Sequence, residues 1–189
     1  MRLFLAVWCL LFATGVGAAT RIDDMQVTVE HTDAGLLVQV SLFIEVPPAI
    51  AWQVMTDYDR MPAYIPDLKE SRIVSAPGEK TRVLQKGVAH IGWFSHEYEV
   101  EREVELTPEI LIKSHGIRGN MRKLEMETHL AAEGTGTRVS YRGLSIPDFW
   151  VPPIIGPALV KRQVVEQFTA IATEMRLRAG VKPPAVNPN

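Results

Sequence analysis

The stretch FSHEYEVEREVEL, residues 94–106, decides the fold class because two kinds of residue alternate along it. One set of alternate positions holds Glu97, Glu99, Glu101, Glu103 and Glu105. The other set holds Phe94, His96, Tyr98, Val100, Arg102, Val104 and Leu106. A period of two residues over this length indicates a β-strand and excludes an amphipathic helix. We therefore predict a strand whose glutamates face solvent and whose other face is interior.

Weaker alternation before and after this stretch predicts consecutive strands over residues 68–144. Turn signals separate them at residues 76–78, 107–108, 118–120 and 133–136. Short turns between successive strands favour an antiparallel meander. The interior positions that this pattern predicts are Ile110, Ile112, Ser114, Leu124, Met126, Thr128, Leu130, Val139, Tyr141 and Gly143.

The segments that flank the meander have other patterns. Residues 25–46 predict a hairpin around 33–35, or one long bent strand, and Pro47-Pro48 then opens two short helical segments that end near residue 65. After the meander, Pro157 is placed to begin a long helix, and Gly180 is placed to follow its last turn. The apolar stripe of this helix is Val160, Val164, Phe168, Ile171 and Met175. We predict a disordered tail over residues 180–189.

The first nineteen residues differ from the rest of the chain. Arg2 precedes the uncharged apolar run of residues 3–13, and small residues at 16–19 suit a signal peptidase site. We predict a signal peptide over residues 1–19 and an exported, periplasmic or secreted domain over residues 20–179. The alternative is a retained membrane anchor. Cys9 is the sole cysteine and lies in this segment, so the cleaved product would have no disulfide and no thiolate.

Composition limits the function classes. Hydrophobic residues make up 47% of the 189 residues, which suits a globular domain with a substantial core. The 20 basic and 22 acidic residues leave a formal net charge of −2. The chain lacks the excess of basic residues that would indicate a nucleic-acid partner. The oligomeric state is left open, and a transient membrane contact is compatible with the sequence.

Few residues form a recognisable chemical motif. The five histidines are dispersed, so we predict no metal site, and no cofactor motif is present. Asp57 and Asp59 lie where one short helix ends and the next begins, which favours capping over paired catalytic carboxylates. His96 and Arg102 are polar residues on the predicted interior face. One explanation is that they contact a polar group of a ligand. The alternative is that Arg102 reaches a carboxylate at the rim, or that a bulge interrupts the alternation.

The order of elements and the local residues resemble one known superfamily. The stretch FIEVPPAIAWQVMTDYDRMPAYIPDLKESRIV, residues 43–74, is similar to the opening of START-like proteins of the SRPBCC group, which includes polyketide cyclases/dehydrases and coenzyme Q-binding proteins. Residues 136–141, GTRVSY, resemble the start of the last strand in that group. The resemblance spans about residues 25–178 and implies an α+β helix-grip fold. In that fold a curved antiparallel sheet wraps around a long C-terminal helix, and two short helices follow the first strands.

The resemblance also implies a cavity between the sheet and the long helix that holds a hydrophobic small molecule such as a lipid, a quinone or a polyketide. Three functions are compatible with it: a binder or carrier, a cyclase or dehydratase, and an interaction module with a packed interior. Export of a lone domain favours the carrier, and no catalytic residue is assigned. The candidate ligand-binding residues are Trp52, Tyr64, Phe94, His96, Tyr98, Arg102, Met126, Tyr141, Phe149, Trp150, Val164 and Phe168.

Overall fold

The computed structural model describes residues 24–91, 94–148 and 156–181. Its helices are α1 (Pro48–Thr56), the short 3₁₀ helix η1 (Tyr58–Ala63) and α2 (Gly156–Arg178). Its strands are β1 (Gln26–Thr32), β2 (Gly35–Ile44), β3 (Leu68–Ile73), β4 (Thr81–Ile91), β5 (Phe94–Thr107), β6 (Leu111–Gly119), β7 (Met121–Glu133) and β8 (Gly136–Pro147). The predicted signal peptide, and nearly all of the predicted disordered tail, lie outside the described residues.

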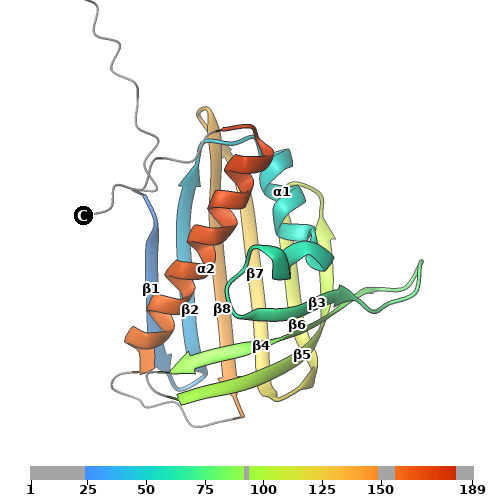
Figure 1. Ribbon diagram of the computed structural model, residues 1–189, viewed down its shortest axis with the longest axis vertical. Helices are drawn as coiled ribbons and strands as arrows, with labels where there is room; N and C mark the ends of the chain where they lie inside the picture. Colours follow the sequence, from blue (N-terminus) through green and yellow to red (C-terminus); the bar gives the residue numbers. More distant parts are fainter. Residues whose placement is uncertain (1–23, 92–93, 149–155, 182–189) are drawn as a thin grey trace, which may run out of the picture.

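One antiparallel sheet contains all the described strands, in the order β1-β2-β8-β7-β6-β5-β4-β3. The sheet is strongly curved, and α2 lies along its concave face (Figure 1). The opening residues form a hairpin, in which Thr32 pairs with Gly35, and α1 and η1 follow β2. The predicted α+β helix-grip fold is therefore confirmed.

Strand β5 shows how the alternating sequence is used. Val100, Arg102 and Val104 are buried on the concave face. The glutamates of the opposite face pair with cations of the neighbouring strand region, as Lys80 Nζ lies 2.6 Å from Glu103 Oε1. The glutamate face is thus outward, as predicted, and cross-strand ion pairs cover part of it.

Two residues predicted to be interior are exposed. The exposed fraction is 40% for Leu106 and 57% for Ile110. Both flank the β5–β6 turn, and Ile110 precedes the first residue of β6. The prediction was wrong at these positions because alternation fixes the face of a residue, whereas burial also requires an element packed over that part of the face.

The expected capping role of the two aspartates was also wrong. No side-chain hydrogen bond caps the junction of α1 and η1 at Asp57. Asp57 Oδ2 instead lies 2.8 Å from Arg178 Nη1 on α2, and Asp59 Oδ1 accepts a 3.0 Å hydrogen bond from the backbone N–H of Ile73. Both carboxylates therefore connect elements that are distant in sequence. The residues next to the helix boundary cannot predict such contacts.

Helix α2 ends as the sequence predicts. Gly180 has φ 71°, and its N–H bonds the carbonyl of Leu177 at 3.1 Å. The N–H of Val181 bonds the carbonyl of Arg176 at 2.9 Å. This pair of bonds is a Schellman motif, which requires the left-handed conformation that glycine adopts without strain.

The core consists of two groups of buried residues. The larger lies between α2, α1 and strands β1, β2, β7 and β8, and includes Leu42, Val54, Val139, Ile171 and Met175. The smaller lies beneath η1 and contains Tyr58, Met61, Leu68, Val83, Val104 and Ile112. Neither group fills the space beneath the first half of α2, and that space is the candidate site.

Candidate ligand-binding cavity

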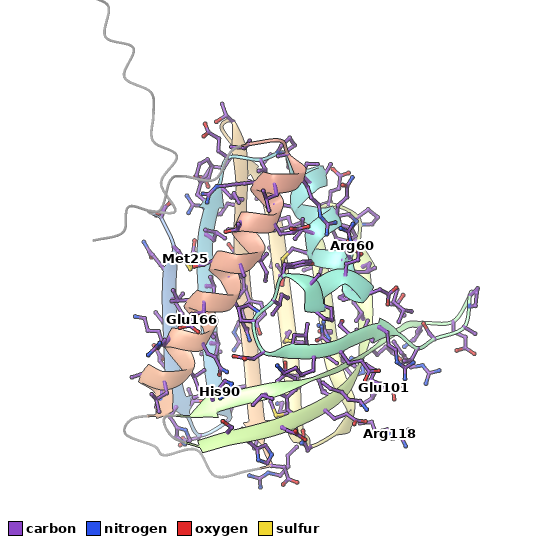
Figure 2. All side chains as sticks on the ribbon, in the orientation of Figure 1. Met25, Arg60, His90, Glu101, Arg118 and Glu166 are labelled. Atoms are coloured by element: carbon purple, nitrogen blue, oxygen red, sulfur yellow. The ribbon has the colours of Figure 1, made fainter. Side chains whose placement is uncertain are left out.

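A cavity of about 280 Å³ lies between the first half of α2 and the concave face of the sheet. It is at the end of the domain where α2 begins and β8 ends, which is the lower end in Figure 1. His90 and Arg118 mark this end in Figure 2, and Arg60 lies toward the other end. The lining residues are Leu36, Val38, Gln85, Val88, Ala89, Tyr98, Val100, Met121, Leu124, Met126, Tyr141, Gly143, Ser145, Pro147, Val160, Gln163, Val164 and Gln167.

The described lining has no charged side chain. Most of it is aliphatic, and its polar groups are the hydroxyls of Tyr98, Tyr141 and Ser145 and the amides of three glutamines. A mainly apolar pocket with a few neutral hydrogen-bonding groups suits a hydrophobic ligand that carries an oxygen or nitrogen function. The chemistry available here is therefore binding and orientation of an uncharged or weakly polar molecule.

Helix α2 supplies one wall. Val160, Gln163, Val164 and Gln167 follow each other at helical spacing and face the cavity, and each is half-buried. Gln163 Nε2 donates a 3.4 Å hydrogen bond to the Val88 carbonyl across the cavity rim. The Gln163 amide thus satisfies a backbone group of the sheet, and the helix wall remains uncharged.

Two tyrosines from the sheet form the opposite wall. The Tyr141 ring lies 5.4 Å from the Phe168 ring, centroid to centroid, at 58°. Burial raises the pKa of the Tyr141 hydroxyl to about 12, and burial also raises the pKa of Tyr98. Both hydroxyls therefore stay protonated at neutral pH, so they can donate hydrogen bonds to a ligand but are poor bases.

Arg102 lies on β5 on the same face as Tyr98 and Val100, at the boundary between the cavity and the smaller core group. Only 8% of it is exposed. Nη1 donates a 3.0 Å hydrogen bond to Ser114 Oγ, the guanidinium carbon lies 5.4 Å from the centroid of the Tyr58 ring, and Nε is buried without a partner. Among the described residues no carboxylate lies within ion-pair distance of this guanidinium.

Burial lowers the pKa of Arg102, and its electrostatic neighbours are the tyrosines Tyr58, Tyr141 and Tyr98. Guanidinium remains protonated in proteins, so this is a buried cation whose described neighbours are neutral. A cation in such a place is costly unless a further polar group compensates it.

The sequence left two alternatives to ligand contact for Arg102: an ion pair with a carboxylate at the rim, and a bulge that interrupts the alternation. Arg102 does not reach a described carboxylate at the rim. The pairing of β5 with β6 does shift register between Glu101 and Arg102, so an irregularity is present where a bulge was considered. The irregularity does not turn the side chain outward, because Arg102 remains buried on the concave face.

The structure separates the candidate ligand-binding residues into groups. Tyr98, Met126, Tyr141 and Val164 line the cavity, and Arg102, which is not a lining residue, interacts electrostatically with the two tyrosines. Trp52 packs against both core groups, Tyr64 donates a 2.9 Å hydrogen bond to the Val54 carbonyl, Phe168 is buried in the larger core group, and His96 is half-buried on β5. Phe149, Trp150 and the side chain of Phe94 lie outside the described part, and their proposed role stays a prediction.

Several lining residues were not predicted from the sequence. Gln163 and Gln167 lie beside Val160 and Val164 on α2 and mark a helix face that is interior but only partly apolar. An uncharged polar residue repeated on the inner face of an amphipathic helix is the signal that was available. Leu36, Val38 and Gly143 gave no such signal, because their residue types suit a filled core equally well.

A second hollow has the opposite character. It has a volume of about 270 Å³, and its lining includes Glu105, Lys113, Glu125, Glu127 and Arg142, side chains of the outward face. Its charged lining does not suit a hydrophobic ligand. In the described part of the chain, no cluster of three or more histidine, cysteine, aspartate or glutamate side chains is arranged to hold a metal ion.

The sequence of residues 36–180 matches the family model described as polyketide cyclase / dehydrase and lipid transport. This match covers most of the chain: it includes β2 from its second residue, β3 to β8 and all of α2. The chain belongs to this family. The predicted membership of the START-like superfamily is thereby confirmed. No curated protein sequence matches the chain.

Solved structures of several proteins share the fold. The STAR-related lipid transfer protein from Xanthomonas axonopodis superimposes with TM-score 0.65 at 13% identity, over 84% of this chain and 97% of that one. A protein from Thermus thermophilus gives 0.63 at 18%, over 76% and 99%. An aromatase/cyclase from a Streptomyces species gives 0.57 at 14%, over 76% and 96%. At these identities the likeness shows the fold alone.

Proposed function

We propose that the domain is a binder and carrier of a small hydrophobic molecule that has at least one hydrogen-bonding oxygen. The uncharged, mainly apolar cavity of about 280 Å³ beneath α2 is the observation that carries this proposal. The family description includes lipid transport, and one structural neighbour is named a STAR-related lipid transfer protein, which supports the same class of ligand. Lipid, quinone and polyketide-like molecules are the candidates.

The size of the cavity restricts the ligand. A volume of about 280 Å³ is near the lower end of the roughly 300–1,000 Å³ that small-molecule pockets span. A ligand with one or two rings, or a short chain, matches this volume. A phospholipid with two long acyl chains would require the cavity to expand, so smaller ligands are the better candidates.

Arg102 would interact with the polar group of the ligand. Tyr98 and Tyr141 are electrostatic neighbours of its guanidinium, so its positive potential reaches the wall that those two hydroxyls form. In a site with little water, a nearby cation favours a ligand oxygen with a strong dipole, such as a carbonyl oxygen. The ligand would then place its oxygen at the tyrosine wall and its hydrocarbon part against α2.

An enzyme of the cyclase or dehydratase type is the second candidate, favoured by the tyrosines gathered around a buried arginine. These groups can polarise a carbonyl, but a cyclase or dehydratase also needs a base. The described lining contains neither a carboxylate nor an imidazole, and the raised tyrosine pKa values oppose phenolate formation. Binding without chemistry therefore agrees better with this lining.

Export belongs to the proposal as well. The apolar run of residues 3–13 and the small residues that follow support a signal peptide, and a carrier outside the cytoplasm needs no cofactor and no catalytic residue. In the described part of the chain, no helix is both long enough and apolar enough to cross a bilayer. The intact mass of the exported protein tests the processing, and a product that retains Cys9 would replace this view with an anchored domain.

The binding proposal is tested with a matched pair of probes. Menadione and 2-methylnaphthalene share a methylated naphthalene skeleton, but only menadione has carbonyl oxygens. We expect the wild-type protein to bind both, measured by displacement of N-phenyl-1-naphthylamine, and to bind menadione at least tenfold more tightly. Arg102→Met should remove this preference with little effect on the hydrocarbon.

Native mass spectrometry of the protein from an exporting host completes the test. A co-purifying lipid, quinone or similar molecule would identify the ligand class directly. If the wild-type protein binds neither probe and carries no small molecule, the proposed function is wrong.

A further inference from the structure

Two tyrosines of the cavity wall lie over glycines of the sheet. Tyr141 and Gly143 are alternate residues of β8 and share the concave face, and the hydroxyl of Tyr141 is closer to the position of a Cβ atom on Gly143 than two non-bonded atoms can be. The same imagined Cβ would lie 2.8 Å from Tyr141 Cζ and 3.1 Å from Cε1. The ring of Tyr141 is therefore laid along its own strand, which is possible because residue 143 has no side chain.

Tyr98 repeats the arrangement between neighbouring strands. Tyr98 on β5 pairs in register with Gly87 on β4, and a Cβ on Gly87 would lie 2.6 Å from the Tyr98 hydroxyl oxygen. In both pairs the tyrosine ring lies over the backbone at the glycine. Both tyrosines and Gly143 are lining residues of the cavity.

The alternative position of each ring is the cavity itself. Phe168 is buried on one side of Tyr141, with 5.4 Å between ring centroids, so this ring cannot move toward the filled part of α2. If the space over Gly143 were occupied, the open volume next to the Tyr141 ring on the concave face would be the cavity of about 280 Å³. A tyrosine ring displaced into that volume would take up a large part of it.

We propose that the pairs Tyr141–Gly143 and Tyr98–Gly87 set the depth of the cavity and are its specificity-determining residues. This inference rests on the proposed binding function, because it concerns the same cavity. With both rings lying along the sheet, their faces are presented to the ligand, and a flat ring system can stack on them. A bulkier residue at either glycine position would convert the protein into one with a shallow or closed cavity.

Gly143 gives the cleaner test of the two glycines. A Cβ on Gly87 would also lie 2.6 Å from the backbone carbonyl oxygen of Asp67, so Gly87→Ala would disturb the β3–β4 region as well. The three nearest atoms to a Cβ on Gly143 all belong to Tyr141. Gly134→Ala is the control: this glycine lies in the turn between β7 and β8, it is not a lining residue, and its Cβ would meet no atom within 4 Å. Its φ of 56° means that the replacement costs stability without crowding the cavity.

The experiment measures the dissociation constant of N-phenyl-1-naphthylamine for wild type, Gly143→Ala, Tyr141→Leu and the double variant. We expect Gly143→Ala to weaken binding at least tenfold. Gly143→Ala with Tyr141→Leu should bind within about threefold of Tyr141→Leu alone, because the clash has been removed. Gly134→Ala should stay within about twofold of wild type.

A second readout follows the ring directly. The chain has four tyrosines, so 3-fluorotyrosine labelling gives a small set of ¹⁹F resonances, and the Tyr141 signal is the one absent from Tyr141→Leu. Gly143→Ala should shift this signal more than the others. If Gly143→Ala fails to fold but the double variant folds, the clash is still established, and binding by the double variant then tests the depth of the cavity.

The inference is overturned if Gly143→Ala binds the probe as wild type does, if its loss of binding persists in the double variant, if neither variant folds, or if the Tyr141 resonance does not move. Failure of the proposed function looks different. In that case the wild-type protein itself binds no probe, while the ¹⁹F shift in Gly143→Ala still reports where the tyrosine ring lies.

Discussion

The two halves of α2 pack against the same sheet with opposite results. From Phe168 to Met175 the inward residues are buried, and Met175 has no exposed surface. From Val160 to Gln167 the inward residues are half-buried and face a cavity. The apolar spacing is continuous across both halves, so helical periodicity does not distinguish a filled end from a hollow end. Aliphatic side chains of the sheet face both halves of α2. At the filled end β1 and α1 add further buried side chains, whereas at the hollow end the rings of Tyr98 and Tyr141 lie over glycines of the sheet and the space beneath α2 is left open.

The largest expected effect tests this comparison directly. Phe168→Ala should lower the free energy of unfolding by about 3–5 kcal/mol, since it leaves a void in a filled region. Val164→Ala should cost less than about 1 kcal/mol, because the lost methyl groups face existing empty space. Urea unfolding measures both, and equal m-values would show that the native folds are comparable. Similar losses at the two positions would mean that the cavity is closed in solution.

Helix periodicity and strand alternation could predict the fold because both patterns are local. Residues 94–106 establish a two-sided strand, and the stripe on α2 together with Gly180 fixes the long helix and its end. Burial at the rim could not be predicted in this way. Leu106 and Ile110 continue the sequence pattern beyond the part of the sheet that another element covers.

The candidate site was only partly predictable for a related reason. Aromatic and apolar residues line cavities and fill cores alike, so Tyr98 and Tyr141 could not be distinguished from Trp52, Tyr64 and Phe168 by residue type. What separates them is three-dimensional: whether the sheet offers a glycine under the ring, or a second layer of side chains over it. Arg102 was different, because a charged residue at an interior position of β5 stands out in the sequence itself.

The next largest effect concerns the ion pair that joins the end of α2 to the junction of α1 and η1. Arg178 near the end of α2 lies 2.8 Å from Asp57 and 2.7 Å from Glu174, and its guanidinium lies 5.9 Å from the centroid of the Tyr64 ring. Asp57→Asn should cost about 1–2 kcal/mol, below the value for a fully buried pair because both side chains are partly exposed. Thermal unfolding at fixed pH measures it.

Arg60→Met is the matched control for this ion pair. Arg60 lies 3.9 Å from the same carboxylate, but 70% of its side chain is exposed, so its loss should be nearly neutral. Equal effects of Asp57→Asn and Arg60→Met would show that the contact between Arg178 and Asp57 does not hold α2 against η1.

A pH-dependent effect is expected in alkaline solution, where both ends contribute through tyrosine. Burial raises the pKa of Tyr64, at the filled end, and of Tyr141, at the hollow end, to about 12, against about 10 in an unfolded chain. Between these values the unfolded chain has lost protons that the native protein retains, so stability falls as pH rises above about 10. Tyr141→Phe and Tyr64→Phe should each make this loss less steep.

Phenolate absorbance, followed together with circular dichroism, checks the alkaline prediction. While the protein remains folded, little phenolate should form near pH 10, and most of the signal should appear as the domain unfolds. A phenolate transition centred near pH 10 in a protein that is still folded would contradict the burial of these hydroxyls. If Tyr141→Phe alone lacked an effect, water would have free access to the hollow end.

The smallest effect is expected on the convex face of the sheet, which contacts neither half of α2. Glu101 Oε1 lies 3.2 Å from Arg82 Nη1, and Glu101→Gln removes the charge of this pair without changing its shape. Only 14% of the Glu101 side chain is exposed, but 39% of Arg82 is, so solvent still screens the pair, and ordering two long side chains costs entropy. The free energy of unfolding should change by no more than about 0.5 kcal/mol, as at Glu105→Gln, an exposed position on the same face. A loss several times larger at Glu101, measured by urea unfolding, would mean that the ion pairs of β4 and β5 hold the curvature of the sheet, and the depth of the cavity would then depend on the outer face as well as on the two tyrosines.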